Sequence, residues 1–317
     1  MSVKWHGVQS VTRKINDDGP QGATLGILEY LSQSNTSADC VDKDDRFKFI
    51  DDLSILEIVN LLTVGITSFN IKMQIPTDIP DHNQYIPAQN LESQKWLDTI
   101  NEWTKNQQML INGKKTKCLI FNFTQNYQFT TRLMLNDEIV EVLDRTRLLG
   151  TIITSDLKWD DNTANIVKKA NARMQLLRKV SSFGTSRDEL KIIYILFIRS
   201  LLEQSATVWH SSLTQENSDD LERIQKSAIK IIMGSSYQSY MKSLELLDLE
   251  TLSQRREHLC LNFAKACVKN PKLNDMFPRN TKQHEMETRK QEVYKVEHAN
   301  TQRYRNSAII YMQNLFK

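Results

Sequence analysis

Cysteine is scarce in this sequence, and its spacing argues against a structural zinc site. The 317 residues include four cysteines, and none of them forms a C-x-x-C pair, the arrangement from which structural zinc sites are commonly built. His258 lies near Cys260 and Cys267, but this spacing matches no standard finger or knuckle. We therefore expect no structural zinc, and reduced thiols as in intracellular proteins.

Long apolar runs are also absent. No run approaches the ~20 residues that a helix needs to cross a bilayer, and the first residues, MSVKWHGVQSVTRK, lack the apolar centre of a signal peptide. The sequence therefore predicts a soluble intracellular protein of the cytoplasm or the nucleus, with no membrane partner.

The net charge is small, but its distribution is uneven. The chain has 41 Lys and Arg against 38 Asp and Glu, a net charge of +3. Residues 251–317 hold 13 basic against 6 acidic residues, whereas residues 1–250 hold 28 against 32. A basic end suits a polyanionic partner, although a solvated tail is the commoner meaning of such a bias.

The earlier part of the chain mixes helix and strand patterns. A helix is predicted over 91–106, where apolar residues recur on one face. FKFI and LSIL flank Asp51-Asp52 as a hairpin with those two residues in its loop, and 132–143 form a second hairpin that turns at 136–138. A further strand is predicted over 147–154, with a glycine inside it.

After Trp159 the pattern becomes helical. Helices are predicted over residues 165–180, 189–204, 221–234 and 251–269. The second of these is apolar nearly all round and is expected to be buried, and Gly234 is expected to cap the third. The sequence thus predicts an α+β fold with a mixed region at 1–155, a helical region at 156–270 and a basic, weakly ordered extension at 271–317.

The adjacent acids Asp51 and Asp52 have two interpretations. Aspartate is a favoured turn residue, because its side chain bonds nearby backbone groups and it tolerates unusual dihedral angles. Alternatively, two carboxylates on a rigid hairpin can bind Mg²⁺, which takes oxygen ligands and commonly uses one or two carboxylates together with substrate phosphates. The pair alone does not distinguish these interpretations.

An ordered set of motifs around the acidic pair resembles the reverse transcriptases of non-LTR (LINE-type) retrotransposons. In that family a Pro-Gln-Gly turn, an aromatic-x-Asp-Asp hairpin, a Trp, an Asn-x-x-Lys-Thr segment and a Leu-Gly turn precede a helical thumb. The matching residues here are PQG at 20–22, FIDD at 49–52, Trp103, NGKKT at 112–116 and LLG at 148–150. The resemblance covers roughly the first three quarters of the chain and not its C-terminal tail.

The resemblance implies a partial polymerase palm, with an antiparallel sheet and packed helices, followed by an all-helical thumb-like domain. The implied activity is RNA-directed DNA polymerisation by two metal ions, with an RNA template, a DNA primer, dNTPs and Mg²⁺ or Mn²⁺. Asp51 and Asp52 would be the catalytic metal ligands, Asp52 with the less essential role. Nucleotide contacts would come from Gln21, Gly22 and Lys115.

Primer and template contacts are implied for a second set of residues. Leu149 and Gly150 would belong to the turn that grips the primer end. Contacts with template–primer phosphates would come from the basic helix residues Lys168, Lys169, Arg173, Arg178, Arg223 and Lys230. Each set also has a structural interpretation, because an ordinary strand glycine can simply let another backbone approach, and solvated cations on helix faces are common in proteins without such a function.

One part of the family's palm has no counterpart in this sequence. In the family a third carboxylate comes from a strand that lies many tens of residues before the Pro-Gln-Gly turn, and only 19 residues precede Pro20 here. Asp17 and Asp18, the acids upstream of Pro20, lie in the turn itself. We therefore expect an N-terminally incomplete reverse transcriptase, the alternative being a noncatalytic nucleic-acid-binding remnant or domesticated fragment.

This expectation predicts that the purified 317-residue chain is inactive on its own. Because a two-metal site needs carboxylates on both ions, no Mg²⁺-dependent dNTP incorporation should occur on oligo(dT)-primed poly(rA). Robust incorporation in that assay would contradict the expectation.

Overall fold

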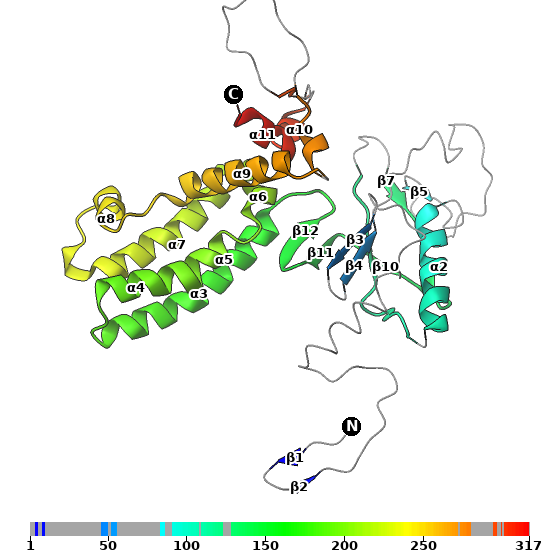
Figure 1. Ribbon diagram of the computed structural model, residues 1–317, viewed down its shortest axis with the longest axis horizontal. Coiled ribbons are helices and arrows are strands. Elements are labelled where there is room, and N and C mark those ends of the chain that lie inside the picture. The colour runs from blue at the N-terminus through cyan, green and yellow to red at the C-terminus, as the bar shows by residue number, and fades with distance from the viewer. Residues whose placement is uncertain are drawn as a thin grey trace, which may run out of the picture. The chain divides into compact units, whose positions relative to one another are not determined.

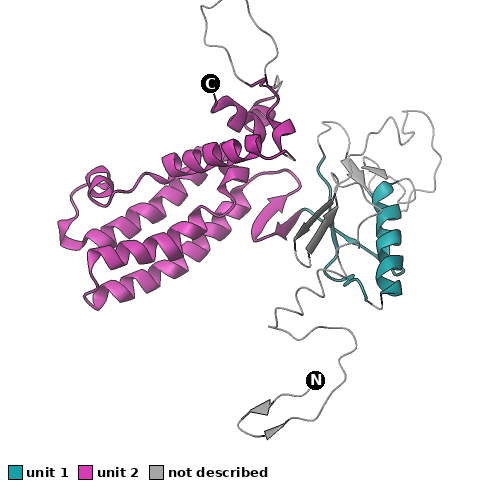
Figure 2. Cartoon of the chain, in the orientation of Figure 1, with its two compact units in different colours: residues 1–144 teal, residues 145–317 magenta. Residues whose placement is uncertain are grey.

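The computed structural model describes residues 91–316, apart from 108, 123–127, 272, 280–293, 297, 298 and 300. Before residue 91 it describes the backbone of five short strands, and for 128–130 it likewise describes the backbone. The chain divides into two compact units, residues 1–144 and 145–317 (Figure 2).

The division between the units lies before the boundary predicted at 155. The difference arises because the hairpin of β11 (Arg145–Leu148) and β12 (Thr151–Thr154) belongs with the helices that follow it. The backbone N–H of Ile152 donates to Asn162 Oδ1 at 3.1 Å, and Ile153 packs against the helical core. These contacts join the hairpin to the second unit.

In the first unit, β3 (Arg46–Phe49) and β4 (Asp52–Ile55) pair antiparallel, with Phe49 opposite Asp52. The predicted hairpin is present, but the prediction that both aspartates lie in its loop is wrong by one residue. Asp52 is the first residue of β4 rather than a loop residue, and Asp51 lies outside the described residues.

The described strands of the whole chain form separate pairs rather than one antiparallel sheet. Two of the pairs are parallel, and both involve strands separated by other elements. The pairs not yet given are β1 (Lys4–Trp5) with β2 (Val8–Gln9), β5 (Asn83–Tyr85) with β7 (Gln128–Thr130), β6 (Lys117–Leu119) with β10 (Glu141–Leu143), and β8 (Met134–Leu135) with β9 (Glu138–Ile139). Mixed helix and short sheets are compatible with the predicted α+β class.

The helix predicted over 91–106 is confirmed as α2 (Glu92–Asn106), whose Ile100 is buried. Gln94 joins α2 to β8, because its side-chain Nε2 donates to the Met134 carbonyl at 2.9 Å and its Oε1 accepts from the Met134 N–H at 2.8 Å. The β8–β9 hairpin turns at Asn136 and Asp137, which have φ values of 50° and 63°. Asn and Asp tolerate these left-handed values better than other non-glycine residues.

The second unit is a bundle of helices (Figure 1). The predicted helices are present there, although the one predicted over 189–204 is assembled from α-helical and π-helical segments. Their bounds are α3 (Asp160–Ser182), α4 (Arg187–Ile193), a π-helical segment (Tyr194–Arg199), α5 (Ser200–Leu202), α6 (Ala206–Trp209), α7 (Gln215–Met233), α8 (Tyr240–Leu246) and α9 (Leu252–Lys269).

Several helix ends in this unit carry capping residues. Capping boxes formed by Ser186 with Glu189 and by Thr251 with Gln254 begin α4 and α9. Gly234, with φ 52°, is the C-cap of α7 as predicted. These side chains satisfy backbone groups that a helix leaves unpaired at its ends.

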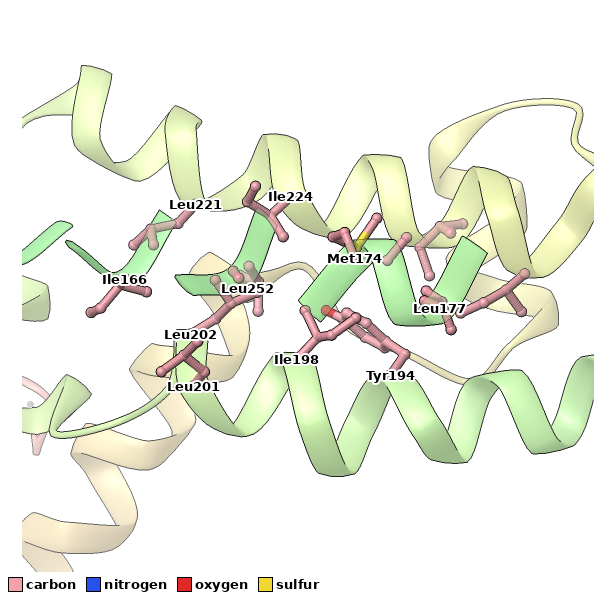
Figure 3. Packing of buried hydrophobic residues seen from close by; sticks show 14 of the residues in the cluster. Ile166, Met174, Leu177, Tyr194, Ile198, Leu201, Leu202, Leu221, Ile224 and Leu252 are labelled. Atoms are coloured by element: carbon pink, nitrogen blue, oxygen red, sulfur yellow. The ribbon is translucent and has the colours of Figure 1, made fainter. Parts of the chain in front are cut away.

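The core of the second unit is built by apolar stripes that meet along α3 and α7 (Figure 3). Ile166, Ala170, Met174 and Leu177 recur at helical spacing on α3, and all four are buried. Full burial of a side chain the size of Ile, Met or Leu contributes about 1.5–3 kcal/mol to the free energy of folding. The stripe that the sequence predicts for α3 therefore faces the core.

The prediction that the helix over 189–204 is buried all round is wrong. Leu190 and Tyr194 face the core, but Ile192, Leu196 and Phe197 are 54%, 62% and 51% exposed. The helix lies at the edge of the bundle, where neighbours cover one face of it and solvent reaches the other.

The described parts of the tail beyond residue 270 include helices that pack on α9. α10 (Gln302–Arg305) and α11 (Ala308–Asn314) form there, and Met312 packs with Phe277 and the Cys260–Cys267 face of α9. Ser212 Oγ donates to the Asn306 carbonyl at 2.7 Å. This apolar cluster is completed by residues that are distant in the sequence, so no local pattern indicates it.

A buried polar contact centred on Arg256 lies beneath α11. Arg256 is 0% exposed, and its Nε donates to His210 Nδ1 at 3.2 Å while its Nη2 donates to Ser218 Oγ at 3.0 Å. Since His210 Nδ1 accepts from a guanidinium, the imidazole must be neutral. Burial and the Arg256 charge lower the pKa of His210 from 6.5 to about 4.

This depressed pKa predicts acid sensitivity of the second unit. Because the unfolded chain takes up the His210 proton near pH 6.5 and the folded chain only near pH 4, the stability that depends on neutral His210 is complete above 6.5 and decreases as the pH falls toward 4. His210→Asn, which keeps a hydrogen-bond acceptor but cannot titrate, should flatten the pH dependence of Tm in this window. An unchanged slope would show that His210 does not cause it.

Candidate nucleic-acid interface

Of the acidic hairpin, the structure describes the backbone of the two strands, β3 and β4. Asp52 begins β4 opposite Phe49, and Asp51, Gln21 and Gly22 lie outside the described residues. Within the part of the chain that the structure describes, no group of three or more His, Cys, Asp or Glu side chains could hold a metal ion. The metal assignment of Asp51 and Asp52 therefore stays a prediction.

The NGKKT segment forms a compact turn directly before β6. The Lys115 N–H donates to the carbonyl of Asn112 at 3.0 Å and to its side-chain Oδ1 at 3.2 Å, and the Thr116 N–H donates to the same carbonyl at 3.0 Å. Asparagine favours such turns because its side chain bonds backbone two or three residues on. The Lys115 side chain is exposed at this turn, so it is accessible to a phosphate.

The LLG segment is the tip of the β11–β12 hairpin and not the interior of a single strand over 147–154. Leu148 pairs with Thr151, so Leu149 and Gly150 form a two-residue turn with φ values of 47° and 90°. Positive φ at both residues is typical of the tight turns that fit the twist of a hairpin. A leucine at such an angle is uncommon, and here its side chain is 50% exposed.

Gln204 lies against this turn and was not predicted as a site residue. Its Nε2 donates to the Leu149 carbonyl at 3.4 Å, and a Cβ added to Gly150 would lie 2.5 Å from that nitrogen. Gln204 Nε2 is the far end of a flexible, exposed side chain and can move aside, so the φ of 90° is what favours glycine at position 150. No sequence pattern indicates this contact, because the two residues are far apart in the chain.

Three of the predicted cationic residues have partners within their own unit. Arg173 Nη1 donates to the Phe197 carbonyl and so joins α3 to the π-helical segment. Arg223 pairs with Asp220 at 2.8 Å on the exposed surface of α7, where such pairs contribute little stability. Lys230 Nζ lies 5.7 Å from the centre of the Tyr237 ring, within cation–π range. The remaining predicted cations, Lys168, Lys169 and Arg178, lie on α3, with Lys169 half-buried and the others exposed.

Charge differs in sign between the two compact units. Residues 145–317 carry 28 Lys and Arg against 19 Asp and Glu, whereas residues 1–144 carry 13 against 19. The unit that contains the predicted phosphate contacts is therefore the basic one. This sign favours a polyanion on the helical unit.

Comparison with known protein families, curated proteins and solved structures finds no match for the chain. Of the described helices, none is by itself long and apolar enough to cross a membrane.

The contact between Gly150 and Gln204 predicts a specific cost for Gly150→Ala. A non-glycine residue at positive φ costs about 1–2 kcal/mol of folding free energy, and the new methyl group would also displace the Gln204 amide. Gly184→Ala is the matched control, since Gly184 has φ 78° and no neighbour within 4 Å of an added Cβ. Urea unfolding should show the larger loss for Gly150→Ala, and the excess should disappear when Gln204 is also alanine.

Proposed function

We propose that the chain contains the later part of a palm and a helical thumb of an RNA-directed DNA polymerase of the non-LTR retrotransposon type. The observation that carries the proposal is the hairpin of β3 and β4, in which Asp52 begins β4 opposite Phe49. A carboxylate at the end of a paired strand can be held toward a metal ion from a defined backbone position. The LLG turn and the helical bundle follow it in the order that the resemblance implies.

The proposed reaction transfers a nucleotide to the 3′-hydroxyl of a primer paired with an RNA template. When bound, two Mg²⁺ ions would activate the attacking oxygen and stabilise the leaving pyrophosphate. In this chain, Asp51 and Asp52 would hold the ions, and the exposed Lys115 turn would offer positive charge to the triphosphate. Gln21 and Gly22 would lie against the incoming nucleotide.

The helical unit would bind the duplex through its phosphates. Its net positive charge and the exposed Lys168 and Arg178 of α3 support this role. Phosphate contacts position a duplex without reading its sequence, which suits an enzyme that copies any template.

A second candidate function is noncatalytic binding of nucleic acid, and the charge difference between the units supports it as well. Both candidates predict salt-dependent binding to duplexes, but they differ in what the acidic hairpin does. In the polymerase the hairpin binds metal ions. In the noncatalytic protein Asp51 and Asp52 are turn residues, and their replacement changes neither metal nor duplex binding.

The discriminating experiment measures Mn²⁺ binding by electron paramagnetic resonance in the wild type and in Asp51→Asn/Asp52→Asn. The polymerase assignment predicts a loss of affinity of at least about tenfold, because both substitutions remove direct ligands. Asp44→Asn/Asp45→Asn is the matched control, since it alters another adjacent acidic pair close to the same strand. Equal binding by all three proteins would refute the metal site.

Duplex affinity is measured in parallel at several salt concentrations. A linear fall of log K with log salt that persists in both double variants would show that duplex binding does not depend on these acidic pairs. Absence of salt-dependent binding in the wild type would refute both candidate functions.

A further inference from the structure

The connection between α5 and α6 is a corner held by a carboxylate that two arginines share and by a hydrogen bond from a buried indole. Glu203 is 14% exposed, and its Oε1 lies 3.3 Å from Arg199 Nε and 3.2 Å from Arg255 Nε. The fully buried Trp209 donates its indole N–H to the Gln204 carbonyl at 3.0 Å. Ser205 then takes a left-handed conformation with φ 54°.

These contacts fix the backbone of an exposed glutamine. A left-handed serine costs free energy and persists where the surrounding structure enforces it, and here the enforcing groups are a carboxylate shared by two arginines and a buried indole. The side chain that this corner directs outward is that of Gln204. It reaches the Leu149–Gly150 turn, where its Nε2 donates to the Leu149 carbonyl and occupies the space beside Gly150.

The hairpin is held to the helical unit at a second point. Asn162, which is 2% exposed near the start of α3, accepts the N–H of Ile152 on β12. With Gln204 at the tip and Asn162 at the strand, two side-chain amides from different helical segments bond the hairpin backbone. The turn therefore has a fixed place on the helical unit, and its exposed side chains Leu148 and Leu149 present apolar surface outward.

We propose that Gln204 is a positioning residue that holds the Leu149–Gly150 turn in the conformation in which it contacts the end of a primer strand. The inference rests on the proposed function, since the primer comes from there. Gln204 touches neither primer nor nucleotide in this assignment and acts by donating its amide to the Leu149 carbonyl. The apolar Leu148 and Leu149 side chains would then meet the sugar of the terminal nucleotide.

The test substitutes Gln204 by Glu, which keeps the size of the side chain and replaces the donor by a carboxylate that repels the Leu149 carbonyl. Gln175→Glu is the matched control, because it adds the same charge to an exposed position of α3 in the same unit. The full 317-residue chain is used. Tm is measured first, and both variants should melt close to the wild type, since the corner is held by Glu203 and Trp209.

Two measurements then separate the positioning role from the proposed function. Amide hydrogen exchange of residues 149–151 in the free protein should accelerate by about two- to tenfold in Gln204→Glu, the factor that corresponds to one net hydrogen bond, and should not change in Gln175→Glu. A primer carrying 4-thiothymidine at its 3′ end, annealed to an RNA template, should photocrosslink to the 145–154 peptide of the wild type. The crosslink yield should fall severalfold in Gln204→Glu alone.

Unchanged exchange in Gln204→Glu would overturn the positioning role. Accelerated exchange with an undiminished crosslink would overturn the link between the turn and the primer. If exchange accelerates but neither the wild type nor either variant gives a crosslink, the proposed function is overturned. The result would still show that Gln204 stabilises the turn.

Discussion

The second unit depends on one interaction, the burial of the apolar stripe of α3 against α7. Met174 and Leu177 are at most 1% exposed. The contact of α3 with α7, along which their stripe lies, is the most extensive one between the described helices of the unit. Helices α4, α8 and α9 pack directly on α7, and α11 packs on α9. Because α3 also carries Asn162 at its beginning, the packing that stabilises the bundle simultaneously fixes the β11–β12 hairpin. The packing of α3 on α7 therefore both stabilises the bundle and determines where the candidate primer-binding turn lies on it.

The interior of the bundle is stabilised by polar bonds as well as apolar contacts. Gln225 is 1% exposed, accepts from the Tyr194 hydroxyl, and donates its Nε2 to Tyr240 Oη at 2.8 Å and to the Glu250 carbonyl at 2.9 Å. A buried amide with all these partners links α7 to the segments on either side of it. Loss of one partner would leave a buried polar group unsatisfied, which costs more than the bond contributes.

The helices could be predicted from the sequence where the information is local. The stripe on α3 and the cap at Gly234 follow from periodicity and residue type within a few turns. The exposed face of the helix over 189–204 could not be predicted, because its pattern gives apolar content but not the number of neighbouring helices. The contact of Phe277 and Met312 with α9 could not be predicted for a related reason, since these residues complete a cluster that α9 begins.

The candidate site shows the same limit at the level of single residues. The LLG motif indicates a functional turn by resemblance, but local propensity opposes a leucine at positive φ, so the sequence predicts a strand where a hairpin turn forms. The contact that the sequence could not indicate comes from a distant part of the chain: the corner at Glu203, with its two arginines and the Trp209 indole, places Gln204 beside the turn. The turn itself needs a positive φ at position 150, which glycine adopts most readily, and only the folded chain shows that Gln204 also contacts this turn.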